Sequence, residues 1–254
     1  MRKTLTSPAP QLSQLKTFNI DLDMTGRHYA LLASCEGQVP EEVALSILKD
    51  LLEEDANKLT LAELRYLFMM VKINSMENEY TVFVTCTHNK EDGTPCKHES
   101  KYKVHLSDND LNKTPDDYKV PTIIWRTEEA EKEYFIMPPT MDLESKLYEY
   151  FQTDKNISFD KISEDKQAAF EFTFIRDAMH LVDKDGNRLV NLDTNLSEVN
   201  KYLDSNKYKT IQKLYELCSQ VDSYGVQNKI YKMKCKECGG NLVFHLPLLN
   251  GLVD

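Results

Sequence analysis

The fold of this chain is decided by a ten-residue stretch, Tyr231-Lys232-Met233-Lys234-Cys235-Lys236-Glu237-Cys238-Gly239-Gly240. Two cysteines separated by two residues and followed by glycine are typical of a zinc knuckle. The thiolates bracket a tight turn, and the glycine adopts a backbone conformation that a side chain would resist. One knuckle supplies only two of the four ligands of a structural zinc site. We therefore expect two more ligands from elsewhere in the chain.

The two missing ligands are predicted at Cys86 and Cys96, of which Cys96 lies 139 positions before Cys235. Cys86 follows the strand-like run 82–85, and the polar stretch 87–95 contains glycine and proline, so it can loop out and return the chain to the metal. Closing so long a loop costs about 4–5 kcal/mol of chain entropy, whereas a structural zinc ion contributes roughly 10–16 kcal/mol. One ion can therefore join both halves into a split zinc ribbon.

The ligand set has alternatives, and the charge around it supports a metal. His88 and His98 compete with the cysteines, because Cys86-x-His88 and Cys96-x-His98 are chemically reasonable pairs. Four ordinary buried thiols are the other alternative. A zinc ion with four thiolates carries a charge of about −2, which nearby cations offset. Several lysines lie within a few residues of the predicted ligands, namely Lys90, Lys97, Lys232, Lys234 and Lys236. We predict the all-cysteine set.

Composition and charge limit the class of protein. The chain has 254 residues, of which 41% are hydrophobic, so it should bury a sizeable core in one large domain or two modest ones. A net charge of −10 disfavours nonspecific binding to nucleic acid. The apolar runs fall short of the roughly 18–20 residues needed to cross a bilayer, and the start of the chain has no apolar signal core. We predict a cytosolic protein with no membrane partner, in which cysteines bind metal rather than form disulfides.

The N-terminal part predicts a hairpin followed by helices. A proline-bearing N-terminal segment precedes two strand-like runs, Thr17–Leu22 and Arg27–Ala33, which we expect to pair as a β-hairpin. A helix should begin at Pro40, which is followed by acidic residues and an apolar stripe. A second helix should begin at Thr60, where Glu63 completes a capping box.

The whole pattern predicts an α+β fold with a mainly helical insertion between the ribbon halves. Strands lead into and out of the first cysteine pair, and two more are expected at Tyr118–Trp125 and Lys132–Met137. Helices are expected after these strands, at Met141–Gln152, Ser163–Val182, Leu196–Ser205 and Lys209–Tyr224. The predicted parts are an N-terminal hairpin with helices (1–78), a zinc-ribbon β module (79–137 and 226–254) and the helical insertion (138–225).

Nothing else in the sequence carries a specific catalytic or metal signal. The run 183–187 resembles the start of a calcium loop, but Thr194 stands where the distal glutamate would be, so we predict a turn. The lone His180 is expected to be structural, and Cys35 and Cys218 to be inert apolar groups. Glycine-rich phosphate loops and nucleophile elbows are absent. A closed four-thiolate site leaves no open position for water, so we predict that the chain is not an enzyme.

The order of these parts resembles the baseplate hub assembly proteins of contractile-tailed, T-even-type bacteriophages. The resemblance is carried by the helix 59–68, the strand into a cysteine half-site, a long insertion, and the closing Cys235-x-x-Cys238-Gly239 with the apolar tail 246–252. One departure is that nine residues separate the cysteines of the first half-site instead of two.

The resemblance implies a late, non-enzymatic assembly factor or chaperone for the phage tail baseplate hub in the host cytoplasm. It would act by binding baseplate hub and tail proteins, with a structural Zn²⁺ ion to fix its surfaces. Candidate contact residues are the apolar ones at the C-terminal tip, namely Leu248, Leu249, Leu252 and Val253. Packing of this tip on its own domain is the alternative, and a homo-oligomer is left open. The lysines near the metal support a second hypothesis, that the chain is a zinc-ribbon protein with a nucleic-acid-binding or regulatory role.

Overall fold

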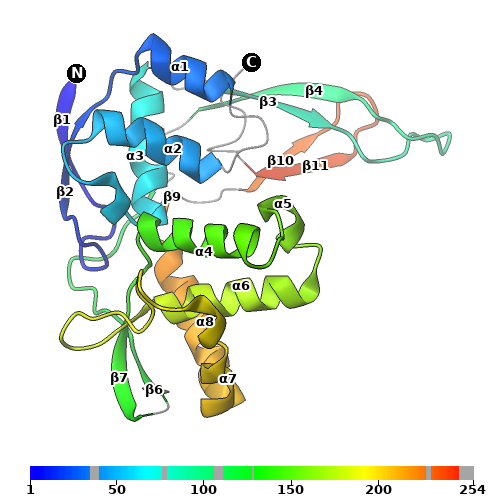
Figure 1. Cartoon of the computed structure of the whole chain (residues 1–254). Helices are drawn as coiled ribbons and strands as arrows, with labels where there is room; N and C mark the ends of the chain where they lie inside the picture. Colours follow the sequence, from blue (N-terminus) through cyan, green and yellow to red (C-terminus); the bar gives the residue numbers. More distant parts are fainter. Residues whose placement is uncertain (35–39, 76–78, 106–110, 128, 227–229, 246–254) are drawn as a thin grey trace.

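A computed structural model describes residues 1–34, 40–75, 79–105, 111–127, 129–226 and 230–245. The fold is mixed, with helices and small antiparallel sheets (Figure 1), which confirms the α+β class at this level. The elements in chain order are β1 (Arg2–Thr6), β2 (Thr17–Asp21), α1 (Gly26–Ala33), α2 (Pro40–Leu51), η1 (Ala56–Lys58), α3 (Leu61–Ser75), β3 (Glu79–Thr85), β4 (Glu99–His105), β5 (Leu111–Asn112), β6 (Thr122–Arg126), β7 (Glu131–Ile136), α4 (Met141–Thr153), α5 (Phe159–Ile162), α6 (Lys166–Met179), β8 (Leu181–Val182), η3 (Leu196–Glu198), α7 (Lys201–Ser205), α8 (Tyr208–Asp222), β9 (Gly225–Val226), β10 (Ile230–Lys234) and β11 (Asn241–His245).

The N-terminal hairpin exists, but its strands differ from the predicted ones. The N-terminal segment that was expected to precede the hairpin contains β1, which pairs antiparallel with β2. The predicted second strand, Arg27–Ala33, is wrong, because this segment belongs to helix α1. The backbone N–H of Thr25 donates to Nδ1 of His28 at 3.0 Å, a capping contact in which histidine takes the place of the usual glutamate. His28 and Leu32, one turn apart, are buried, so this face of α1 joins the core.

Helix α3 begins where the sequence predicts. The backbone N–H of Thr60 donates to Oε2 of Glu63 at 2.9 Å, and the N–H of Glu63 donates to Oγ1 of Thr60 at 3.3 Å. The hydroxyl of Ser7, which follows β1, donates to the other carboxylate oxygen of Glu63 at 2.7 Å. The capping box therefore also ties the hairpin to α3. With α2, this helix builds a first hydrophobic core in which Leu67 and Phe68 are buried.

A second hydrophobic core lies among α4, α6, α8 and the hairpin β6–β7. Trp125 of β6 is fully buried, and its ring lies 6.5 Å from the ring of Phe174 in α6. The predicted zinc-ribbon module includes all of 79–137. The hairpin β6–β7 lies within this range, but it packs with the helices of 138–225 because its alternate apolar residues face them. The three-part division of the chain stays a prediction.

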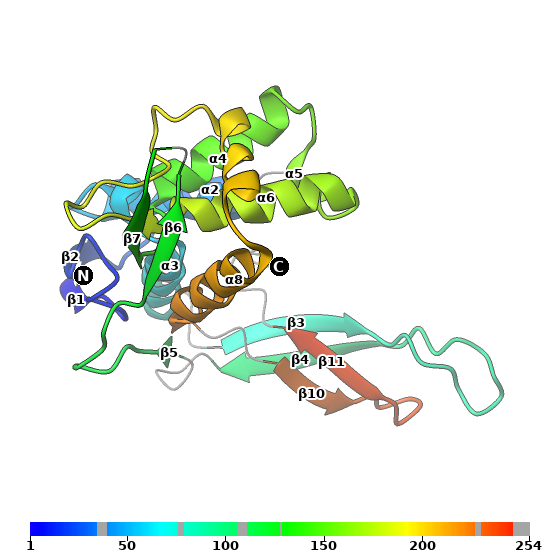
Figure 2. The ribbon, with the colours of Figure 1, turned by 90° about the horizontal axis from the view of Figure 1, so that it is seen from below.

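Two hairpins, β3–β4 and β10–β11, project together from the helical body (Figures 1 and 2). We call residues 79–105 and 230–245 the arm. The short pair β5–β9 sets Asn112 opposite Gly225 and so returns the chain from the helices to the base of the arm. Gly225 has φ +99°, and a Cβ there would lie 2.9 Å from Cβ of Ala62 in α3. Glycine is therefore required where the chain re-enters the arm.

Candidate metal centre

The first cysteine pair lies at the far end of β3–β4, where the hairpin ladder continues beyond both strands. The N–H of Cys86 donates to the carbonyl of His98 at 2.9 Å, and the N–H of Cys96 donates to the carbonyl of His88 at 2.8 Å. Lys97 has φ +49°, a left-handed conformation that turns the chain directly after Cys96. The stretch 87–95 thus loops out and returns, as predicted, and both thiols reach the same point.

The second pair forms a tight knuckle between β10 and β11. The N–H of Cys235 donates to the carbonyl of Gly240 at 2.8 Å, and the N–H of Gly239 donates back to the carbonyl of Cys235 at 2.9 Å. Gly239 has φ +70°, so glycine fits here at no steric cost, as the knuckle pattern predicts.

All four predicted cysteines meet at one point. Sγ of Cys86 lies 3.6 Å from Sγ of Cys238, and Sγ of Cys96 lies 3.8 Å from Sγ of Cys235. The four sulphurs are all within 4.8 Å of one another. A tetrahedral zinc ion with Zn–S bonds of about 2.3 Å separates its sulphurs by about 3.8 Å. The donor set and its spacing therefore fit one tetrahedral ion without rearrangement of the hairpins.

His88 lies beside this cluster without being a member of it. Its Nδ1 is 3.8 Å from Sγ of Cys86, but neither His88 nor His98 belongs to the group of mutually close ligand atoms. The ring of His88 instead lies against Gly240 on the other hairpin. A Cβ at Gly240 would lie 2.8 Å from Cγ of His88. The second glycine of the ten-residue stretch, Gly240, is therefore needed for the contact between the first loop and the knuckle.

The thiols differ in how readily they ionise. Burial raises the pKa of Cys86 to about 12 and also raises the pKa of Cys96. Backbone N–H groups of Cys238 and Glu237 outweigh burial at Cys235 and lower its pKa to about 6. Four adjacent thiolates without a cation would repel one another, so binding of a cation at this point would release protons.

Contacts between the hairpins hold the cluster in place. Nζ of Lys90, in the first loop, lies 3.2 Å from Oε1 of Glu237 in the second knuckle. The hydroxyl of Tyr102 donates to the carbonyl of Lys234 at 3.1 Å. The ring of Phe244 stacks on Tyr102 at 5.8 Å between ring centroids. No sequence motif marks these aromatic residues, although alternation along β4 and β11 places them on the inner faces.

The predicted contact residues at the C-terminal tip lie outside the described residues, namely Leu248, Leu249, Leu252 and Val253, and so does Cys35. Their predicted roles stay predictions.

Cys218 belongs to a separate buried cluster with Asp177 and His180, between α6 and α8. Nε2 of His180 lies 3.2 Å from Oδ1 of Asp222, and the other ring nitrogen lies 3.0 Å from the carbonyl of Arg176. Burial raises the pKa of Asp177 to about 6 and also raises the pKa of Cys218. Each of these polar groups is engaged inside the core, as expected for structural residues.

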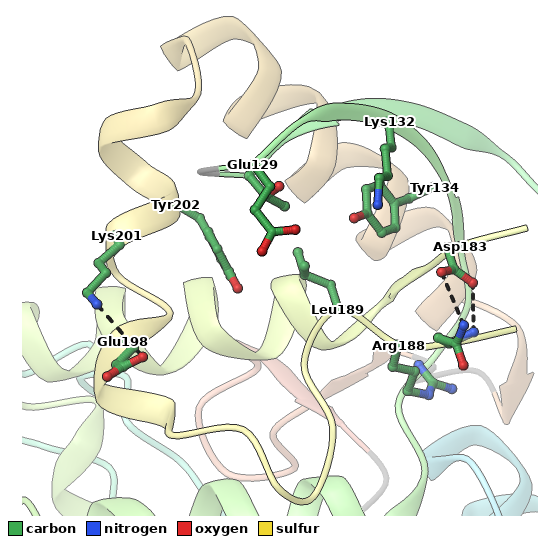
Figure 3. Close-up of a pocket in the computed structure, with 11 residues that line it drawn as sticks. Glu129, Lys132, Tyr134, Asp183, Arg188, Leu189, Glu198, Lys201 and Tyr202 are labelled. Carbon is green, nitrogen blue, oxygen red and sulfur yellow. Dashed lines mark hydrogen bonds and ion pairs between the residues drawn. The ribbon is translucent and has the colours of Figure 1, made fainter. Parts of the chain in front are cut away.

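A hollow of about 350 Å³ lies between β7, the turn after β8 and α7 (Figure 3). Its charged lining is balanced, because three acidic residues face three basic ones, namely Glu129, Asp183 and Glu198 against Lys132, Arg188 and Lys201. The side chain of Asp183 accepts hydrogen bonds from Asn187 within the predicted turn. The hollow therefore does not favour a ligand of either charge.

With the cysteine geometry established, comparison with known proteins decides the family. Residues 14–252 match the family described as T4 bacteriophage base plate protein. The chain belongs to this family. Membership confirms the resemblance to T-even-type phage baseplate proteins over nearly the whole chain. A search of curated proteins found no match for this baseplate-family chain, and neither did a search of solved structures. Within the ranges described above, it contains no helix long and apolar enough to span a bilayer.

Proposed function

We propose that this baseplate-family protein is a non-enzymatic assembly factor, or chaperone, for the phage tail baseplate hub. It binds hub and tail proteins in the host cytoplasm and holds a structural zinc ion that stiffens the arm. One observation carries the proposal: four thiols from two hairpins, far apart in the sequence, lie within 4.8 Å of one another on an arm that projects from the body. A projecting rigid arm suits a protein that holds others in position.

Zinc is the ion that this donor set favours. All-sulphur tetrahedral sites select zinc or iron over the harder magnesium and calcium ions, and structural zinc sites are commonly closed by four cysteines. A site filled by four protein ligands has no position for a water nucleophile. The metal therefore supports structure, which agrees with a role in binding rather than catalysis.

A second candidate function is nucleic-acid binding through the arm. The observation that favours it is the set of exposed lysines on the two hairpins, namely Lys101, Lys103, Lys232 and Lys234. The net charge of −10 opposes it, because the whole chain repels a phosphate backbone at long range. Binding to DNA with a steep dependence on salt would support this second function over the first.

Two measurements on one preparation test the proposal. The tagged chain is purified from phage-infected cells; bound proteins are identified by mass spectrometry, and zinc and iron are measured by elemental analysis. We expect baseplate hub proteins in the eluate and one zinc ion per chain. An eluate without tail proteins would overturn the assembly role, and a preparation without metal would overturn the zinc site. Iron in place of zinc would correct the metal alone.

A further inference from the structure

The outer faces of the two hairpins share one arrangement. In β10–β11, Lys232 stands opposite Val243, and Lys234 lies two residues further along the strand on the same face. Both lysines are exposed, and Val243 is 57% exposed, whereas the neighbouring Leu242 is 3% exposed. We call Lys232, Lys234, Asn241 and Val243 the basic face. It therefore presents an apolar side chain beside two cations.

Hairpin β3–β4 repeats this pattern. Phe83 stands opposite Lys101, and Lys103 lies two residues further along β4. The ring of Phe83 is 48% exposed, and Nζ of Lys101 lies 5.5 Å from its centroid. Since both hairpins combine an exposed apolar group with lysines on their outer faces, the pattern belongs to the arm as a whole.

The arm is much less acidic than the body. Its side chains include seven lysines and five carboxylates, a net charge of +2 that a zinc ion with four thiolates, at about −2, would bring close to zero, whereas the chain carries −10, so the remaining residues carry −12. Neither Lys232 nor Lys234 forms an ion pair within the part of the chain that the structure describes. Unpaired cations on a projecting arm are available to an acidic partner.

We infer that the basic face binds an extended acidic segment of another protein, an inference that rests on the proposed role in protein binding. Side chains two residues apart on a strand are about 7 Å apart, so carboxylates at alternate positions of the segment meet Lys232 and Lys234. An apolar residue of the segment covers Val243. Within the described residues no third strand pairs with this two-stranded sheet, so its edges leave backbone groups for an added strand, apart from the carbonyl of Lys234, which accepts from Tyr102. The phosphates of a nucleic acid would also pair with the lysines, but a nucleic acid would bury less apolar surface against Val243 than an apolar side chain would.

Fluorescence anisotropy with the full, metal-bound chain tests this inference. The probe is a labelled peptide in which two glutamates and one valine stand at successive alternate positions with serine between them, so that all three side chains share one face; the same peptide with lysine in place of glutamate and a single-stranded oligothymidylate are comparison probes. We expect the acidic peptide to bind most tightly, and the double variant Lys232→Glu/Lys234→Glu to weaken it by about tenfold. The matched control is Lys209→Glu/Lys213→Glu, which reverses two exposed lysines of α8 and should change the affinity by less than about twofold.

Three results would overturn the inference. These are equal losses in the two double variants, tighter binding of the oligonucleotide than of the acidic peptide, and self-association by sedimentation that the arm variant alone abolishes. The last result would assign the face to a second copy of the chain. If the arm variant still captures hub proteins as well as the unchanged chain, the inference fails while the assembly role stands. If the unchanged chain captures none, the assembly role itself fails.

Discussion

At the scale of single residues, Cys235 is the most sensitive test of the metal centre. We expect Cys235→Ser to abolish stoichiometric zinc, because a hydroxyl at this position is a weak zinc ligand. The melting temperature of the arm's own transition should fall by about 10 °C, while that of the body should not change. Elemental analysis and calorimetry measure the two effects. The control is Cys218→Ser, since Cys218 is equally buried but lies between α6 and α8. Full zinc content in Cys235→Ser would contradict the site.

The contact between Gly240 and His88 separates packing from metal binding. We expect Gly240→Ala to destabilise the arm, because its Cβ would lie 2.8 Å from Cγ of His88. The loss should be smaller when His88 is also replaced by alanine, while His88→Ala alone keeps its zinc. Thermal melts and zinc analysis of the three variants check this. Gly26→Ala is the control, because no atom lies within 4 Å of that Cβ. Loss of zinc in His88→Ala would make the histidine a ligand.

Asp177 should make the stability of the helical core depend on pH. Burial raises its pKa from 3.8 to about 6. A carboxyl whose pKa is raised by folding stabilises the protein fully below pH 3.8, and this contribution is lost as the pH rises through about 6. The loss at neutral pH is up to about 3 kcal/mol. Asp177→Asn should therefore unfold at higher urea than the unchanged protein above about pH 7, with little difference near pH 4.

Exposed Asp116 provides the control for this measurement, because Asp116→Asn changes the same chemical group at the surface. Urea titrations of the three proteins across the acidic and neutral range give the comparison. Identical pH profiles for Asp177→Asn and the unchanged protein would contradict the effect of burial.

At the scale of elements, Arg176 links three helices of the second core. Its Nε lies 2.8 Å from Oε1 of Glu144 in α4, and its Nη1 pairs with Asp222 in α8. Glu144 is 1% exposed, so Arg176→Ala leaves a buried carboxylate without its cation. We expect the free energy of unfolding to fall by about 3–5 kcal/mol, measured by denaturant unfolding.

The matched control is Arg126→Ala in the hairpin β6–β7. Arg126 lies 3.7 Å from Glu131, and both side chains are more than half exposed. An exposed pair contributes below about 1 kcal/mol. Similar losses from the two substitutions would mean that burial does not strengthen the contacts of Arg176.

The elements also show what could be predicted from sequence. The capping box of α3 and the second knuckle are local patterns, so they were found. Helix α1 was missed because His28 replaces the expected glutamate, and its two buried residues do not make a full apolar stripe. The stack of Tyr102 on Phe244 was missed because the residues that meet there are far apart in the chain. The meeting of the cysteines is predictable because Cys235 and Cys238 have knuckle spacing, and one knuckle needs two further ligands to complete a tetrahedral site.

At the scale of the whole molecule, removal of metal should loosen the arm and leave the body folded. The two large hydrophobic cores lie mostly in the body; from the arm only Val82 belongs to the first core, with Val84, Tyr231 and Phe244 packed against it, and the arm's own cluster is the small one around the cysteines. A chelator should therefore speed hydrogen exchange in β3–β4 and β10–β11. The emission of Trp125, the single tryptophan, should not change, because it is buried in the second core. Unfolding of both parts together on chelation would contradict this separation.

The distance along the chain between the two halves of the cysteine cluster also sets an order of events during synthesis. Ribosomes add about 5–20 residues per second, so the 139 positions from Cys96 to Cys235 take roughly 7–28 s to translate. The first two thiols wait during that time as an open half-site. A nascent chain interrupted before Cys235 cannot close the arm, so only chains translated past Val243 would display the surface that we propose for partner binding.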